Sequence, residues 1–167
     1  MKISLKAILA CVAFVLFGAS IGMFALSFID SQTVVLSKTT VTELANGFEI
    51  AFGQTNLEGK NILGTLFAFI FVAVGALAAC YGVLFSLTKK SKADKKVKML
   101  CAICSFVVTG LVPAVLLFLT VATVGASDSS FAIGGLVGAS CKLGIGAILA
   151  GIFSLVGSCC LSVSELQ

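Results

Sequence analysis

The stretch from Thr88 to Lys98 constrains this chain more than any other, because it is the only dense run of charge in the sequence. Its sequence is TKKSKADKKVK, with six lysines against one aspartate, and long apolar runs lie on both sides of it. Short lysine-rich loops between apolar segments stay on the cytoplasmic side when a membrane protein inserts. The sequence therefore predicts a multi-pass membrane protein with this loop in the cytoplasm.

Composition supports the membrane class and limits the range of partners. Hydrophobic residues make up 59% of the 167 residues and charged residues only 11%, which is outside the range of ordinary soluble domains. All basic residues are lysine, and the net charge of +4 is concentrated at the expected membrane edges. The absence of arginine weakens the case for a site that binds phosphate or carboxylate groups through two parallel hydrogen bonds. We therefore expect the lipid bilayer as a partner and no nucleic acid.

Four apolar segments are long enough to cross a bilayer, since about 20 residues suffice for a helix. The predicted fold is an all-α membrane protein, a four-helix transmembrane bundle with a small extracellular β-hairpin in the first outer loop. The chain forms one domain, residues 1–167. The expected spans are 7–29, 62–87, 99–124 and 142–163, joined by outer loops 30–61 and 125–141 and by inner loop 88–98.

The first outer loop carries the strand signal. Residues 33–42 are rich in Thr and Val, which favour strands, and Asn46-Gly47 is typical of a two-residue hairpin turn. A turn there would pair Ala45 with Phe48, Glu43 with Ile50, and Val41 with Phe52. A two-stranded ribbon has unpaired edges and is marginal in water, so we expect it to contact the bundle or a partner. The expected contact residues are Val35, Val41, Phe48, Ile50 and Phe52.

Two features interrupt the later spans. Pro113 lacks an N–H and clashes with the carbonyl four residues back, at Thr109, so we expect a bend there. The apolar run 131–163 would form a helix of about 50 Å, too long for a hydrocarbon layer of about 30 Å. We therefore expect residues 131–141 to form an outer extension or an irregular cap, with Lys142 snorkelling at the outer interface. The alternative is an intramembrane cation that binds an anionic ligand.

The distribution of charge predicts the orientation. The inner segments hold eight lysines against Asp94 and Glu165, a net charge of +6. The outer segments hold three lysines against five acidic residues, a net charge of −2. Both termini are therefore expected in the cytoplasm, and we expect the plasma membrane as the location.

Catalytic chemistry has little support in the sequence. Histidine is absent, which removes the usual general base, and no acidic residue lies within the four spans, where proton and ion relays usually need one. We predict no enzyme activity, cofactor or metal. One redox alternative remains, because Cys101-Ala102-Ile103-Cys104 is a C-x-x-C at the start of a span. It would face a reducing compartment, however, and apolar packing explains such cysteines equally well.

Small residues mark two helix faces for close packing. Gly18 and Gly22 form a small-x-x-x-small pair on the first span, and such pairs let helices approach closely in lipid. A longer ribbon on the fourth span comprises Gly146, Ala150, Ser154 and Ser158. Packing within one bundle and contact with a second subunit are both open, and Gly18 and Gly22 are candidate interface residues.

The layout resembles the claudin-like tetraspan proteins in four respects. These are cytoplasmic termini, a larger strand-bearing first outer loop, a proline-bent third span, and the cysteine pair Cys159-Cys160 late in the fourth. The tryptophan signature and paired loop cysteines of claudins are absent, so no functional residue is carried over. The resemblance implies a bundle that assembles laterally through its outer loop.

Three functions are consistent with these features. The first is a non-catalytic tetraspan that self-associates or acts as an accessory or structural subunit. The second is a subunit of an oligomeric pore or carrier, although Ser20, Ser27, Thr65, Ser105, Thr109 and Ser154 are sparse and isolated. The third is a thiol oxidoreductase that uses Cys101 and Cys104. We expect a homo-oligomer or a partner membrane protein.

Overall fold

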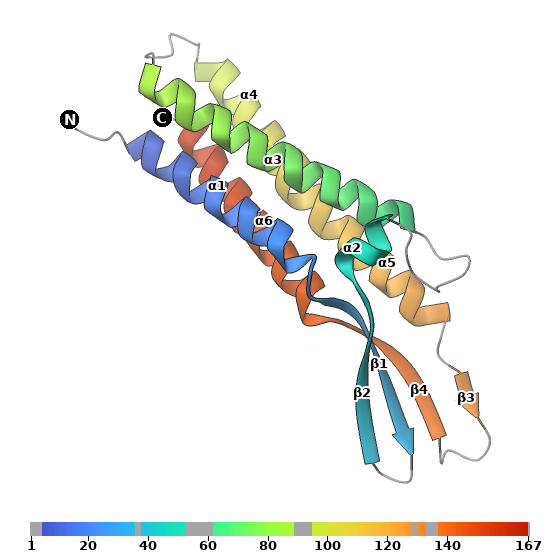
Figure 1. Cartoon of the computed structure of the whole chain (residues 1–167). Coiled ribbons are helices and arrows are strands. Elements are labelled where there is room, and N and C mark those ends of the chain that lie inside the picture. The colour runs from blue at the N-terminus through green and yellow to red at the C-terminus, as the bar shows by residue number, and fades with distance from the viewer. Residues whose placement is uncertain are drawn as a thin grey trace.

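The computed structural model describes residues 5–35, 38–52, 62–88, 95–127, 130–132 and 137–166. Residues 53–61 of the expected outer loop 30–61, and residues 89–94 of the lysine-rich loop, therefore lie outside the described residues. Within them the protein is mostly helical, and four helices are long and apolar enough to cross a membrane: Leu5–Met23, Leu63–Leu84, Lys95–Leu119 and Ile145–Leu166. A small β-sheet extends from one end of this bundle (Figure 1).

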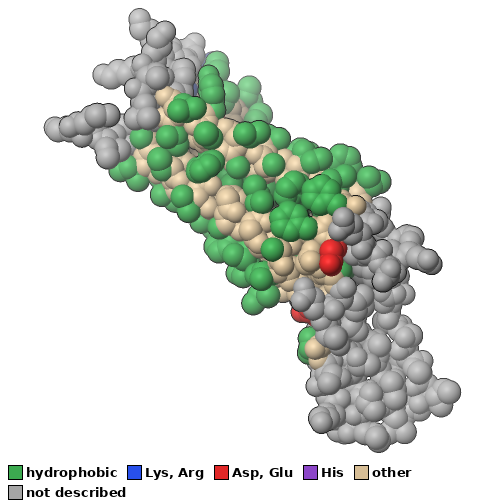
Figure 2. All heavy atoms as spheres, in the orientation of Figure 1, with side chains coloured by type: hydrophobic (Ala, Val, Ile, Leu, Met, Phe, Trp, Pro, Cys, Tyr) green, Lys and Arg blue, Asp and Glu red, His purple; other side chains and the backbone are tan. Residues whose placement is uncertain are grey.

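The surface of the bundle is apolar. Figure 2 shows hydrophobic side chains spread over the helices, and many large ones are strongly exposed, including Val15 at 67%, Leu77 at 71% and Phe118 at 64%. Apolar patches of this extent are rare on soluble monomers and mark contact with lipid or protein. The four helices and this surface agree with a multi-pass membrane protein.

The first and fourth helices both fall short of the expected spans at their sheet-side ends, and the reason is the same at both. Helix α1 (Leu5–Met23) ends six residues before the predicted boundary, and α6 (Ile145–Leu166) starts three residues after its own. Beyond α1 the chain turns at residues 24–26 and then continues as a strand, and a strand also precedes α6, since Ile29 pairs with Leu143. Hydropathy alone does not distinguish an apolar helix from a buried strand, so both predicted boundaries were wrong.

The second span is a single α-helix, whereas the third contains a π-helical turn. Helix α3 (Ile62–Thr88) matches its expected span. The third span consists of α4 (Lys95–Phe106), the π-helix η1 (Val107–Leu111) and α5 (Val112–Ser127). In η1 the Val112 N–H donates to the Val107 carbonyl, one residue farther back than in an α-helix. Because Pro113 follows directly and has no N–H, the irregularity expected there takes the form of a π turn.

The third span packs mainly against one helix before this π turn and against another after it. Helix α4 packs on α6, whereas α5 packs more extensively on α3, and η1 contacts both of those helices. Thr109 and Gly110 are buried at the crossing. Gly110 lies directly against Ser158, so there is no room for a side chain at that position. The span therefore crosses the bundle diagonally and stays in contact at its centre.

In the part of the chain that the structure describes, the β-sheet has four strands, in the order β2-β1-β4-β3. Strands β1 (Ser27–Val35) and β2 (Lys38–Asn46) form an antiparallel pair, and β1 also pairs with β4 (Val137–Leu143), beside which lies β3 (Ser130–Ala132). The described residues of the segment 131–141, expected as an outer extension or irregular cap, are thus strand. Lys142 lies opposite Asp30 in β4 rather than at a helix end. Because β1 pairs with β2 on one side and with β4 on the other, both of its edges are covered.

The predicted turn at Asn46-Gly47 is wrong. Chain reversal between β1 and β2 occurs between Val35 and Lys38, which are paired, and Gly47–Phe52 forms a short helix, α2. Asn46 caps it: the Glu49 N–H donates to Asn46 Oδ1 at 2.9 Å, and the Asn46 N–H donates to Glu49 Oε2 at 3.0 Å. This reciprocal arrangement is a capping box. The predicted pairs Ala45–Phe48, Glu43–Ile50 and Val41–Phe52 therefore do not form.

An aromatic cluster joins the sheet end to the helices. Phe24 follows the end of α1 and is fully buried, with ring centroids 4.8 Å from Phe28, 6.0 Å from Phe48 and 5.4 Å from Phe69. These separations are typical of favourable aromatic pairs. The cluster fixes α2 over α3 and orients the sheet relative to the bundle.

Candidate functional site

The structure separates the expected contact residues into three places rather than one face. Val35 and Val41 lie in the sheet, the residues from Phe48 to Phe52 lie in α2, and Gly18 and Gly22 lie on α1. Each place presents a different surface.

Of the two sheet residues, only Val41 lies on an edge. Val35 belongs to β1 and pairs with Lys38 on one side and Val137 on the other. Val41 belongs to β2, which has β1 as its only neighbour strand in the described sheet, and its side chain is 63% exposed. The outer edge of β2 therefore offers nine residues of backbone to another strand.

The α2 residues pack mainly inward. Ile50 is 3% exposed and belongs to the core, and Phe48 contacts the rings of Phe24 and Phe69. Phe52 is 58% exposed, with its ring stacked on Phe48 at 6.4 Å. The α2 segment thus attaches the sheet to the bundle, and only Phe52 has a large exposed surface.

Gly18 and Gly22 face away from the bundle. Both are exposed, and a Cβ built at either position meets no atom within 4 Å. The ribbon on α6 behaves in the opposite way, because Gly146, Ala150, Ser154 and Ser158 are all buried. The α6 ribbon is used for packing within the chain, and the α1 pair is open.

Serine hydroxyls tie the helices together. The Ser20 Oγ donates to the Ala150 carbonyl at 2.8 Å, linking α1 to α6. The Ser162 Oγ donates to the Ala102 carbonyl at 2.8 Å, and the Ser105 Oγ donates to the Glu165 carboxylate at 2.9 Å, linking α4 to α6. Ser154 Oγ is buried without a hydrogen-bond partner among the described atoms. Most of these hydroxyls are therefore used in contacts between helices.

The two cysteines of the C-x-x-C motif lie one turn apart on α4. Cys101 and Cys104 are both exposed and both free thiols. Cys104 lies on the outer surface of the bundle, whereas Cys101 lines a cavity near the start of α4. Across the described residues, no group of three or more potential metal ligands comes together.

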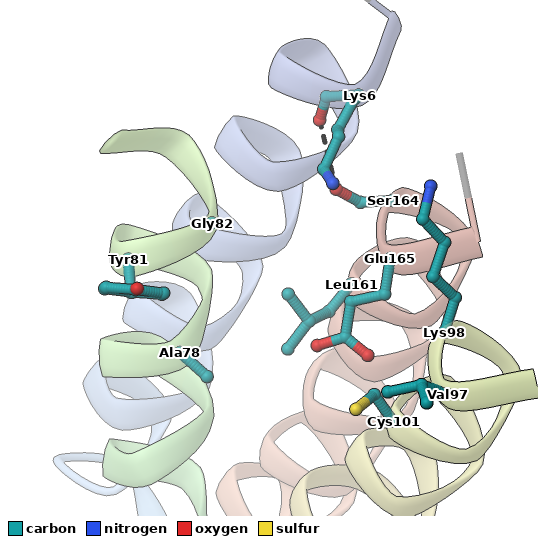
Figure 3. A pocket seen from close by; sticks show the side chains of 10 residues that line it. All are labelled: Lys6, Ala78, Tyr81, Gly82, Val97, Lys98, Cys101, Leu161, Ser164 and Glu165. Carbon is teal, nitrogen blue, oxygen red and sulfur yellow. Dashed lines mark hydrogen bonds between the residues drawn. The ribbon is translucent and has the colours of Figure 1, made fainter. Parts of the chain in front are cut away.

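The lining of that cavity includes Lys6 near the start of α1 and Glu165 near the end of α6. Figure 1 shows these two helix ends at the same end of the bundle. The volume of the cavity is about 260 Å³. Figure 3 shows α3 on one side of it and α4 on the other, with Leu161 and Glu165 of α6 between them. Lys6 and Lys98 contribute the two cations of its described lining, and the Ser164 Oγ donates to the Lys6 carbonyl at 3.1 Å.

Sequence reasoning missed this cavity, because its residues come from four helices that are far apart in the chain. It also missed the α2 helix, although a signal was present. Asn46-x-x-Glu49 has the spacing of a capping box, and that pattern competes with the hairpin reading of Asn46-Gly47.

No family model, curated protein or solved structure matches this chain.

Proposed function

We propose that this protein is a non-catalytic tetraspan membrane protein that self-associates laterally through the outer edge of β2. The observation that carries the proposal is the position of β2: a nine-residue strand at the edge of the sheet with an exposed Val41. Unprotected edges of this kind recruit further strands, and backbone hydrogen bonds supply the affinity.

The simplest assembly is a two-fold dimer. If β2 of one copy pairs antiparallel with β2 of a second, the same residues meet on both sides, as an isologous interface requires. The sheet would then continue across both copies, and the open α1 face with Gly18 and Gly22 would serve as a second contact between bundles. An accessory role, in which the edge receives a strand of another membrane protein, uses the same surface.

We further propose that both termini are cytoplasmic and that the sheet is extracellular, at the plasma membrane. The charge difference, +6 against −2, supports this orientation. The ends of α1 and α6 near the termini lie at the same end of the bundle, opposite the sheet (Figure 1). The layout resembles that of claudin-like tetraspans, which is the class we propose.

The two alternatives have weaker support. For a pore or carrier, the serines that could line a path are mostly hydrogen-bonded between helices. For a thiol oxidoreductase, the motif cysteines would lie on the cytoplasmic side in the proposed orientation, where thiols are kept reduced.

Native mass in mild detergent tests the proposal. Val41→Lys adds a charge to the exposed edge without changing the backbone, and lysine on an edge strand opposes pairing. We expect the parent to form dimers or larger oligomers and Val41→Lys to shift the population toward the single chain. Val41→Thr is the matched control, because threonine keeps the β-branched shape and adds no charge. A parent that is entirely monomeric would contradict the proposal, as would a Val41→Lys variant with the parent's mass.

A further inference from the structure

The diagonal course of the third span leaves an opening beside α4. Within the third span, α4 packs on α6 and only α5 packs extensively on α3, so α3 and α4 diverge toward the end where α4 begins. The cavity of about 260 Å³ occupies this divergence, with Ala78 and Gly82 of α3 facing Val97 and Cys101 of α4 (Figure 3). It therefore lies between two helices whose outer surfaces are apolar, at one edge of the membrane-spanning region.

The lining changes character along the cavity. Most of its wall is apolar, and the fully buried Leu161 forms its floor. Among the described residues of the lining, the charged groups are two lysines, Lys6 and Lys98, and one carboxylate, Glu165, which accepts from Ser105. The described lining thus carries one net positive charge beside an apolar wall.

The helix ends add to this positive charge. Lys6 lies in the first turn of α1, and Lys95, Lys96 and Lys98 lie in the first turn of α4, while neither turn contains an acidic residue. Helix N-termini carry a partial positive charge that favours anions and disfavours cations. Two helix N-termini with lysines therefore lie at the same end of the bundle (Figure 1), and a bound anion would offset the repulsion at each.

We propose that the cavity binds an anionic phospholipid, with its phosphate near Lys6 and Lys98 and an acyl chain along the opening between α3 and α4. Cationic side chains combined with an apolar wall suit a ligand that is both charged and apolar, and basic pockets between membrane helices bind lipid head groups in this way. A volume of about 260 Å³ accommodates a head group rather than a whole lipid. The chains of the lipid would therefore remain in contact with the apolar outer surface.

Native mass spectrometry of the purified chain with added phosphatidylglycerol tests this, with phosphatidylcholine as the uncharged comparison. Lys6→Gln with Lys98→Gln removes both cavity cations. The control, Lys95→Gln with Lys96→Gln, removes the same charge. Both control lysines are exposed on α4, the helix that carries Lys98, and neither lines the cavity. We expect about tenfold weaker phosphatidylglycerol binding in the first variant and less than about threefold in the second.

A second variant tests the apolar half. Ala78→Phe fills the cavity without changing charge, and we expect it to weaken phosphatidylglycerol binding by a similar factor. Equal losses in the two lysine variants would overturn the proposal, because the attraction would then be diffuse. Displacement of the lipid by inorganic phosphate at equal concentration would also overturn it, because the site would then recognise a soluble anion. Lipids are counted per chain, so the result does not depend on assembly through β2.

Discussion

Two regions of this molecule use glycine in opposite ways. At the junction of bundle and sheet, a Cβ at Gly146 would meet the carbonyl oxygens of Met23 and Ser27 at 2.8 Å, and one at Gly47 would meet the Phe28 ring at 2.7 Å. On the outer face of α1, a Cβ at Gly18 or Gly22 would meet nothing within 4 Å. The junction glycines allow close approach within the chain, and the α1 glycines leave space that the chain itself does not fill.

The difference separates stability from assembly. Substitutions at the junction should destabilise the fold, because the neighbouring atoms are backbone or a fully buried ring. Substitutions on the α1 face should leave the fold intact and affect only contacts with another molecule.

Phe24→Ala should cost about 3–5 kcal/mol in the free energy of unfolding. The side chain is fully buried and contacts three other phenylalanine rings. Denaturant unfolding in a fixed detergent measures the loss. Phe14→Ala is the matched control, since Phe14 is 46% exposed on α1. Equal losses in the two variants would show that the aromatic cluster contributes nothing specific.

Gly146→Ala should cost about 1–3 kcal/mol, because the new methyl group meets backbone that is unable to move independently. Gly151→Ala is the control on the same helix, where nothing lies within 4 Å. Thermal unfolding of the pair gives the comparison, and we expect the control to match the parent or exceed it slightly. A Gly146→Ala variant as stable as the Gly151→Ala variant would refute the close approach of α6 to the start of β1.

Asn46→Ala should cost about 1 kcal/mol, the usual loss for an N-cap. The Glu49 N–H would lose its acceptor at 2.9 Å, and α2 would be less firmly held. Asn46→Asp keeps an acceptor oxygen and should retain most of the stability. The same unfolding assay decides between them, and an unchanged Asn46→Ala variant would argue that the capping box does not stabilise α2.

The smallest effect on stability is expected at Gly18→Ala and Gly22→Ala. A methyl group meets no atom at either position, and alanine is the better helix former by up to about 1 kcal/mol. These variants should therefore be as stable as the parent or more so. A loss of more than about 1 kcal/mol in the monomer would mean that α1 is packed on this face within the chain.

The sequence predicted the parts of the fold that depend on local composition. The four apolar segments form four long helices, and the third is interrupted shortly before Pro113 by the π-helix η1. The predicted helix ends were wrong where apolar residues continue past a helix, at residues 24–29 and in β4. The conformation there depends on pairing between distant segments of the chain. Periodicity within one segment carries no information about such a partner.

The candidate contact surface was predictable only in part. Val41, Gly18 and Gly22 are exposed, whereas Ile50 lies in the core and Val35 lies in a strand paired on both sides. Assigning Asn46-Gly47 to a turn placed the α2 residues on a ribbon face. The capping interaction with Glu49 converts the same residues into a helix that packs inward.

Disulfide cross-linking of Val41→Cys in membranes tests the central claim most directly. Residue 41 lies one position from the middle of the nine-residue β2, so antiparallel pairing of two β2 edges brings it close to its own copy. Under mild oxidation we predict a covalent dimer well above the level that the native cysteines of the parent produce. Leu63→Cys, at the start of α3 and 60% exposed, lies outside both proposed contact surfaces and reports the background from chance collisions. A Val41→Cys dimer no more abundant than those of the parent and Leu63→Cys would contradict assembly through this edge.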